Sequence, residues 1–173
     1  EIDSVVNAGT FPTVEDRVNL PYIECLLKEL QRWLPVVPLA FPHRLTEDDF
    51  YEGYFIPKGS IVFPNAWAIS QDEANYKDPK RFWPERFENP ETAEPEPYKY
   101  NRLLINTAYQ LRILGISAGI NFADATIFIA VASILATFDI GKPLDEDGNE
   151  VEPKISYGPG LIGCVAQTSS WWT

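Results

Sequence analysis

Proline limits how long any helix or strand in this chain can run. Fifteen of the 173 residues are proline, and they are spread through the sequence. A proline removes a backbone donor and clashes with the preceding turn of a helix, so it ends helices and interrupts strands. The chain is therefore expected to form few long uninterrupted elements and many turns.

The first helix is predicted at residues 20–34, which read LPYIECLLKELQRWL. Pro21 suits the first turn of a helix, where its missing N–H costs nothing, and Pro35 stops the helix. Between them apolar residues recur at spacings of three and four, the pattern of a helix with one buried face. These residues are Ile23, Leu26, Leu27, Leu30 and Leu34.

Residues 35–64 are predicted to form short antiparallel strands, because β-branched and aromatic side chains alternate there with turn-forming residues. The expected strands lie at 36–41, 50–56 and 61–63, with a turn near 46–49 and Gly53 between aromatic pairs.

Residues 65–100 are predicted to form an exposed acidic loop. Five of the prolines fall in this stretch, so regular structure is hard to sustain. Four glutamates between residues 88 and 96 accompany them, which favours contact with water. They are Glu88, Glu91, Glu94 and Glu96.

A second helix is predicted at residues 122–138, where apolar side chains occupy every side of the helix. Such a helix lies in a core with protein on several sides, or it spans a membrane. We expect the buried helix, because Gly115, Gly119 and several Ser and Ala residues dilute the apolar run. Residues 145–150 read as the polar turn of a hairpin. Two main helices with short antiparallel strands predict a single α+β domain over residues 1–173.

Charge and the supply of metal ligands exclude several classes of function. The 14 Lys and Arg against 25 Asp and Glu give a net charge of −11, which repels phosphate, so no nucleic-acid partner is expected. Two cysteines, Cys25 and Cys164, and one histidine, His43, are too few for a Cys/His zinc site, and no metal site is predicted. The residues after Glu1 do not read as a signal peptide, and the chain has no Met. We therefore expect a trimmed or partial chain that is intracellular and soluble, in an unassigned compartment.

Three charged residues are predicted to form a structural ion network. Glu29 and Arg32 stand three residues apart on the first predicted helix, so their side chains share one face and can pair. Arg86 follows in the sequence WPERF of residues 83–87 and could reach the same carboxylate. A buried cluster of this kind is far more often a structural lock than a catalytic group. No catalytic residue is assigned.

Several motifs, in their order and spacing, resemble the cytochrome P-450 family of haem-thiolate monooxygenases, and within it the fungal microsomal-type enzymes. The resemblance implies the C-terminal third of such an enzyme and a fold-holding role for Glu29, Arg32 and Arg86. It also places His43 and Arg44 near a haem propionate, although by themselves these two residues read as a surface pair at a strand end. The motifs are E-x-x-R at residues 29–32, PHR at 42–44, GYFIPKGSIVFPNAWAIS at 53–70, PERF at 84–87, FADATIFIAVASILATFDI at 122–140 and DEDGNEVEP at 145–153.

The resemblance fails at the residues that hold the haem. Family members carry F-x-x-G-x-R-x-C-x-G before the second helix, with the cysteine thiolate as the axial ligand of the iron. Residues 110–119 of this chain read QLRILGISAG, so Gly119 alone matches and Ser117 occupies the cysteine position. A neutral hydroxyl is a poor iron ligand and cannot push electron density toward O–O cleavage. We therefore expect no haem in the chain as it stands, and no oxygenation by it alone.

Three functions remain open for this sequence. The resemblance implies an ancestral haem-dependent oxygenation of a small lipophilic substrate, in enzymes that also cover the haem with a long helix this sequence does not supply. A haem-free enzyme of small-molecule metabolism could use carboxylates or His43 as acid or base in a repurposed pocket. A non-catalytic interaction or scaffolding protein could use the apolar surface of the second helix. Self-association, a lipophilic small molecule or a partner chain would then cover that surface.

Overall fold

A computed structural model of the chain describes residues 1–89, 94, 120–145 and 147–151. Helices and short antiparallel strands alternate along the described ranges, so the fold belongs to the predicted α+β class. The helices are α1 (Ile2–Val5), η1 (Val14–Asn19), α2 (Pro21–Trp33), α3 (Ala66–Ser70), η2 (Pro84–Phe87) and α5 (Ile120–Thr137), where η marks a 3-10 helix. The strands are β1 (His43–Arg44), β2 (Asp49–Tyr51), β3 (Tyr54–Ile56) and β4 (Ile61–Val62).

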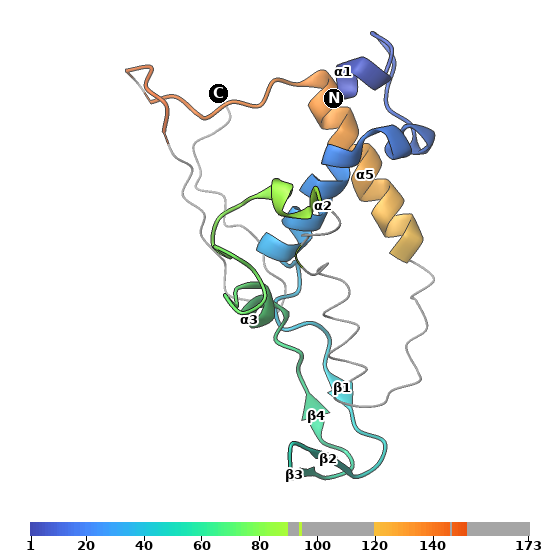
Figure 1. Cartoon of the computed structure of the whole chain (residues 1–173), viewed down its shortest axis with the longest axis vertical. Coiled ribbons are helices and arrows are strands. Elements are labelled where there is room, and N and C mark those ends of the chain that lie inside the picture. The colour runs from blue at the N-terminus through green and yellow to red at the C-terminus, as the bar shows by residue number, and fades with distance from the viewer. Residues whose placement is uncertain (90–93, 95–119, 146, 152–173) are drawn as a thin grey trace.

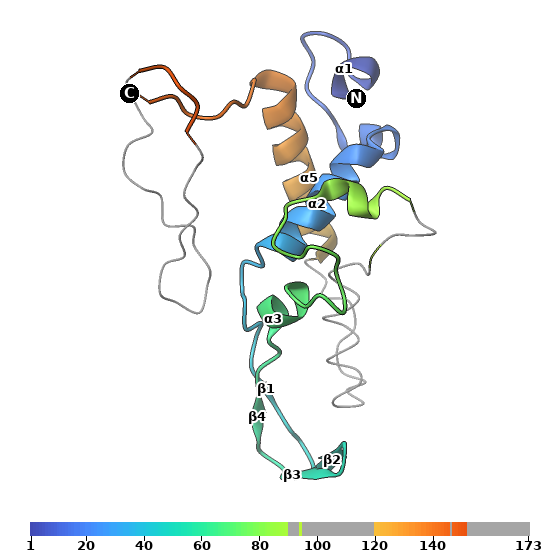
Figure 2. The same cartoon turned by 60° about the vertical axis from the view of Figure 1, so that its left-hand side comes forward.

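Helix α2 forms where the sequence predicts it and is buried on two sides. Pro21 occupies its first turn, and the helix ends at Trp33, two residues before Pro35. One side faces α5 and the other faces η2, as the two views of Figures 1 and 2 show. The predicted apolar stripe is right at Ile23 and Leu27, which are buried, and wrong at Leu30, which is 38% exposed. The second buried side carries Cys25, Glu29 and Arg32 instead, because η2 covers it.

The main apolar core lies between α2 and α5. Leu20, Ile23 and Leu27 pack against Phe128 and Ala132 of α5, and all five residues are buried. Side chains of α1 pack against the same cluster, so the N-terminal helix also covers α5. Segments far apart in the sequence, α1 and α5, therefore lie side by side (Figure 1).

The strands form an arm that extends away from the helices (Figures 1 and 2). Strand β1 pairs with β4 and β2 pairs with β3, both antiparallel, with Phe50 opposite Phe55. The strand predicted at 50–56 is a hairpin of two strands instead, because Glu52 and Gly53 have positive φ values of 49° and 86° and turn the chain between β2 and β3. The strand predicted at 36–41 is wrong, because no strand is assigned there and Ala40 has a positive φ of 47° that breaks an extended path.

Residues 65–89 pack against α2, so the prediction of an exposed loop is wrong for this part of the stretch. The Asn65 side chain caps α3 by accepting a hydrogen bond from the Ala68 N–H at 3.0 Å. Tyr76 is 1% exposed and clusters with Phe87 of η2 and Cys25 of α2. Aromatic burial therefore outweighs the prolines and glutamates of this stretch.

Helix α5 lies within two residues of the predicted bounds but is buried on one side only. Phe128 and Ala132 are fully buried, whereas Phe122 is 78% exposed and Phe138, just after the helix, is 65% exposed. The expectation of protein on several sides is therefore not met, because only α1, η1 and α2 pack on this helix among the described elements. None of the described helices has both the length and the apolar content needed to cross a membrane.

The predicted polar turn after α5 is confirmed. Leu144 and Glu150 form an antiparallel bridge around it. The Asp145 carboxylate accepts hydrogen bonds from the backbone and side chain of Asn149 and from the backbone of Asp147, and the Asn149 bonds chiefly lower the pKa of Asp145.

Candidate functional site

The Glu29–Arg32 pair is fully buried between α2 and the segment that follows α3. Arg32 donates from Nε to Glu29 Oε2 at 2.7 Å and from Nη2 to Glu29 Oε1 at 2.8 Å, with both side chains 0% exposed. This two-bond geometry results from the spacing of three on α2, which places both side chains on one face. Arg32 also donates to the Ser70 carbonyl at 2.8 Å and lies 5.2 Å from the centre of the Tyr76 ring.

Arg86 joins this pair from η2. Its Nε lies 3.2 Å from Glu29 Oε2, an ion-pair contact that is not aligned as a hydrogen bond. Its Nη1 donates to the Lys77 carbonyl at 2.8 Å and to the carboxylate of Glu94. The structure thus brings together Glu29, Arg32 and Arg86, and it adds Glu94, for which the prediction of an exposed loop is wrong.

Charge balance could have indicated from the sequence that a further carboxylate, here Glu94, belongs to this cluster. One buried glutamate with two buried arginines leaves one positive charge uncompensated, and a buried unpaired charge is costly. Two carboxylates and two guanidinium groups give a neutral cluster instead. The Glu29 carboxylate also accepts the Trp83 backbone N–H at 2.7 Å. Since its oxygens are already engaged by several donors, this carboxylate is arranged to hold η2 on α2 and not to transfer protons.

The other predicted site residues lie away from this cluster. His43 and Arg44 form β1 in the arm, where His43 is half-buried opposite Val62 and Arg44 is exposed. Ser117 and the rest of residues 110–119 lie outside the described residues.

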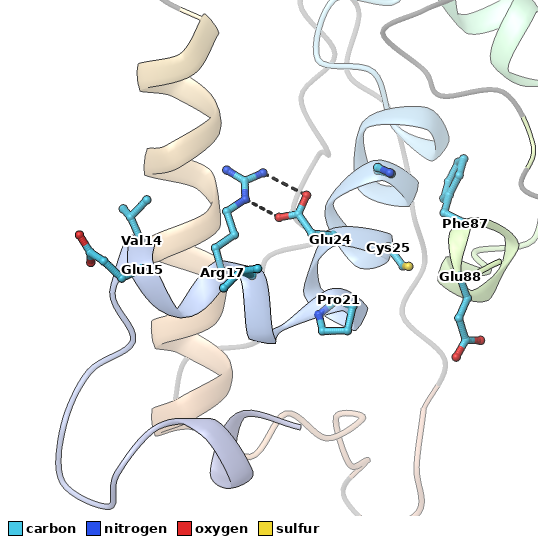
Figure 3. A pocket seen from close by; sticks show the side chains of 10 residues that line it. Val14, Glu15, Arg17, Pro21, Glu24, Cys25, Phe87 and Glu88 are labelled. Atoms are coloured by element: carbon cyan, nitrogen blue, oxygen red, sulfur yellow. Dashed lines mark hydrogen bonds and ion pairs between the residues drawn. The ribbon is translucent and has the colours of Figure 1, made fainter. Parts of the chain in front are cut away.

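A pocket of about 550 Å³ opens between η1, α2 and η2 (Figure 3). Its lining mixes apolar side chains with both signs of charge. Arg17 donates from Nε and Nη2 to Glu24, and these bonds, with one to Asp124 of α5, raise the pKa of Arg17. The lining residues are Val14, Glu15, Arg17, Val18, Pro21, Glu24, Cys25, Lys28, Phe87 and Glu88. His43 is not among them, whereas the carboxylates of Glu15, Glu24 and Glu88 are.

Comparison with known proteins assigns the chain to a family. The profile of the cytochrome P-450 family matches residues 1–162. The chain is 44% identical over 165 residues to cytochrome P-450 monooxygenase 176 of Postia placenta, covering 95% of this chain and 31% of that relative. It is 40% identical over 162 residues to cytochrome P-450 monooxygenase claR of Ampulloclitocybe clavipes, covering 94% of this chain and 29% of that relative. It is 43% identical over 162 residues to cytochrome P-450 monooxygenase ple1 of Rhodocybe pseudopiperita, covering 94% of this chain and 30% of that relative.

The chain therefore belongs to the cytochrome P-450 family. It spans about 30% of the length of these curated relatives. The family resemblance stated from the motifs is confirmed.

The haem-ligand motif of the family is not kept in the sequence of this chain. The family ligand is a cysteine thiolate, and serine occupies that position at residue 117. Cys25 does not replace it, because this side chain is buried on α2 against Tyr76 and Phe87 and burial raises the pKa of its thiol. A thiol held in its neutral form is a poor metal ligand.

Proposed function

We propose that this chain is a cytochrome P-450 relative that does not carry out monooxygenation by itself. The observation that carries the proposal is the chemistry of residues 110–119, where Ser117 stands in place of the ligand cysteine. The positions of the other motif residues have changed as well, to Gln110, Ile113 and Gly115. Oxygen insertion into a small lipophilic substrate is then the ancestral activity of the family and not an activity of this chain.

The purified chain, incubated with haem and reduced under carbon monoxide, is expected to show no Soret band of the thiolate type. A hydroxyl at residue 117 cannot provide the thiolate electron density that produces this band. The measurement is the absorption difference spectrum, with a thiolate-ligated cytochrome P-450 as the positive reference. A thiolate-type band from the unmodified chain would refute the proposal.

The matched variant is Ser117→Cys. It restores the ligand atom but leaves Gln110, Ile113 and Gly115 unchanged, so we expect it to remain unable to oxygenate a lipophilic substrate. The fourfold variant that also restores Phe, Gly and Arg at those positions separates the effect of the motif from that of the ligand atom. Substrate turnover by Ser117→Cys alone would overturn the claim.

A second candidate function, interaction with another copy of this chain, is favoured by the exposed apolar side of α5. The charged side chain of this helix, Asp124, is paired with Arg17, so the exposed side is uncharged. Two copies could therefore approach there without the repulsion that a net charge of −11 causes elsewhere. Burial of a large apolar side chain gains about 1.5 to 3 kcal/mol. The exposed apolar residues are Phe122, Ile127, Ile134, Leu135 and Phe138.

Sedimentation velocity at micromolar concentration is expected to show a dimer. The variant Ile134→Asp, which places a charge in the middle of the exposed side, is expected to sediment as a monomer. Thr46→Asp in the arm serves as the control, because it adds the same single negative charge at an exposed position outside α5. A compact monomer of the unmodified chain, together with no binding of an apolar dye, would contradict the proposal. A dye-binding monomer would contradict it too and would favour a lipophilic ligand.

A further inference from the structure

The pocket between η1, α2 and η2 shares no lining residue with the cluster of Glu29, Arg32, Arg86 and Glu94. Its volume of about 550 Å³ lies within the range of about 300 to 1,000 Å³ that small-molecule sites occupy. Its lining comes from three elements, as Figure 3 shows. What the pocket can bind depends on how the charges of this lining are compensated.

The lining carries an excess of negative charge. Three glutamates line the pocket together with two basic residues, Arg17 and Lys28. Arg17 is bound by two carboxylates, Glu24 of the lining and Asp124 of α5, so its positive charge is already compensated. The other two glutamates of the lining are exposed, and neither forms an ion pair with another described residue. A cation is therefore the ligand that the lining favours.

The two remaining carboxylates, Glu15 and Glu88, lie at opposite ends of the row of side chains in Figure 3. Glu15 is on η1 with Val18, which is 82% exposed, so water screens its charge. Glu88 follows η2 on the side of Phe87 and Cys25, which are 5% and 6% exposed. Charges interact more strongly beside a buried apolar wall, because the effective dielectric constant is lower there. Glu88 therefore offers the stronger site for a cation.

The Cys25 side chain is a second feature of the pocket, independent of its excess charge. Its thiol is buried, lines the pocket and forms no hydrogen bond with the described residues. Burial chiefly raises the pKa of this thiol, Lys28 opposes the rise and Glu88 adds to it, so the group is neutral. A neutral, polarizable sulfur can contact an apolar group without giving up a hydrogen bond. The pocket thus has an apolar wall next to an acidic edge.

We propose that this pocket binds a small lipophilic amine, with the protonated nitrogen beside Glu88 and the apolar body against Cys25 and Phe87. An anion of the same size would be repelled by the carboxylate, and a neutral molecule would gain no charge pair, so the head group sets the specificity. The inference goes beyond the proposed function, and it depends neither on haem nor on the association of two copies.

Three probes with the same apolar tail separate charge from apolar contact: 4-phenylbutylamine, 4-phenylbutanol and 4-phenylbutyrate. Nuclear magnetic resonance shifts of the backbone amides of the full chain measure binding of each at neutral pH. A ligand of about eleven non-hydrogen atoms in an open site is expected to bind with a Kd in roughly the millimolar range. The alcohol is expected to bind about fivefold more weakly than the amine, the size of one exposed charge pair, and the anion more weakly still. The shifts are expected at the amides of Cys25, Lys28 and Glu88.

Glu88→Lys is the sharpest variant, because it reverses the charge at an exposed position and leaves the buried wall in place. We expect the order of the probes to reverse, with the anion binding about fivefold more tightly than the amine. Glu88→Gln is expected to bring the amine and the alcohol within about twofold of each other. Glu47→Lys, at an exposed position in the arm, makes the same change in net charge and is expected to keep the order of the unmodified chain.

Several results would overturn the proposal. These are equal binding of the amine and the alcohol to the unmodified chain, tighter binding of the anion, and no binding of the amine at millimolar concentration. An unchanged order in Glu88→Lys, or a reversed order in Glu47→Lys, would also overturn it. Shifts confined to the exposed side of α5, around Ile134, would place the amine on that apolar surface and not in the pocket.

Discussion

Replacement of Glu29 by alanine is expected to lower the free energy of unfolding by about 3 to 5 kcal/mol, the usual cost of breaking a buried ion pair. Glu29 accepts two hydrogen bonds from Arg32 and one from the Trp83 backbone, all at 2.7 to 2.8 Å. Without the carboxylate, the Arg32 guanidinium stays in the interior as an uncompensated charge. Urea denaturation followed by far-ultraviolet circular dichroism measures the change.

Glu94, the second carboxylate of the cluster, limits the number of buried charges that the loss of Glu29 leaves unpaired. Because Arg86 keeps Glu94, removal of Glu29 leaves one buried cation unpaired and not two. Glu47→Ala, at an exposed position in the arm, is the control and is expected to change stability by less than about 0.5 kcal/mol. A loss below about 1 kcal/mol for Glu29→Ala would show that the cluster does not hold the fold.

Replacement of Phe128 by alanine is expected to cost about 3 to 5 kcal/mol of unfolding free energy, the usual range for a buried phenylalanine. Phe128 is fully buried and packs with Leu20, Ile23 and Leu27, so its removal opens a cavity between α2 and α5. The change also removes the ring that lies under the Arg17 guanidinium. The midpoint of thermal unfolding and the urea midpoint should both fall.

Phe11 provides a matched control away from the exposed side of α5. It is 68% exposed, so Phe11→Ala removes the same side chain without opening a cavity, and we expect a change within about 0.5 kcal/mol. If both variants lost the same stability, the α2–α5 contact would not be the main core of the described chain.

Elements set by local sequence could be predicted, and elements set by distant contacts could not. Pro21 and Pro35 bracket α2, and a run of mostly apolar residues marks α5, so the sequence predicts the bounds of both helices to within two residues. Leu30 follows the helical stripe but lies exposed, because the second buried side of α2 is defined by η2, more than fifty residues away. The sequence predicts a loop at residues 65–89 for the same reason, since the partner that buries Tyr76 is not adjacent in sequence.

The charged site could be predicted in part for a similar reason. Glu29 and Arg32 are three residues apart on one helix, and Arg86 lies in a motif, so these three could be grouped from the sequence. Glu94 was indistinguishable from the other glutamates of an acidic stretch. The pairing of Arg17 with Asp124 joins residues 107 positions apart, and no local pattern points to it.

The arm built from β1 to β4 has a consequence for how the molecule opens. Each of its sheets has two strands of two or three residues, and isolated two-stranded hairpins are at best marginally stable in water. The rings of its aromatic pair, Phe50 and Phe55, lie 5.2 Å apart between their centres and are tilted by 52°, and both side chains remain largely exposed to solvent. Low-stability units of this kind open and close many times before the rest of a protein unfolds. The amide hydrogens of the arm are therefore expected to exchange with solvent through local opening. Those in the middle of α2 are expected to exchange only when the helical core unfolds cooperatively.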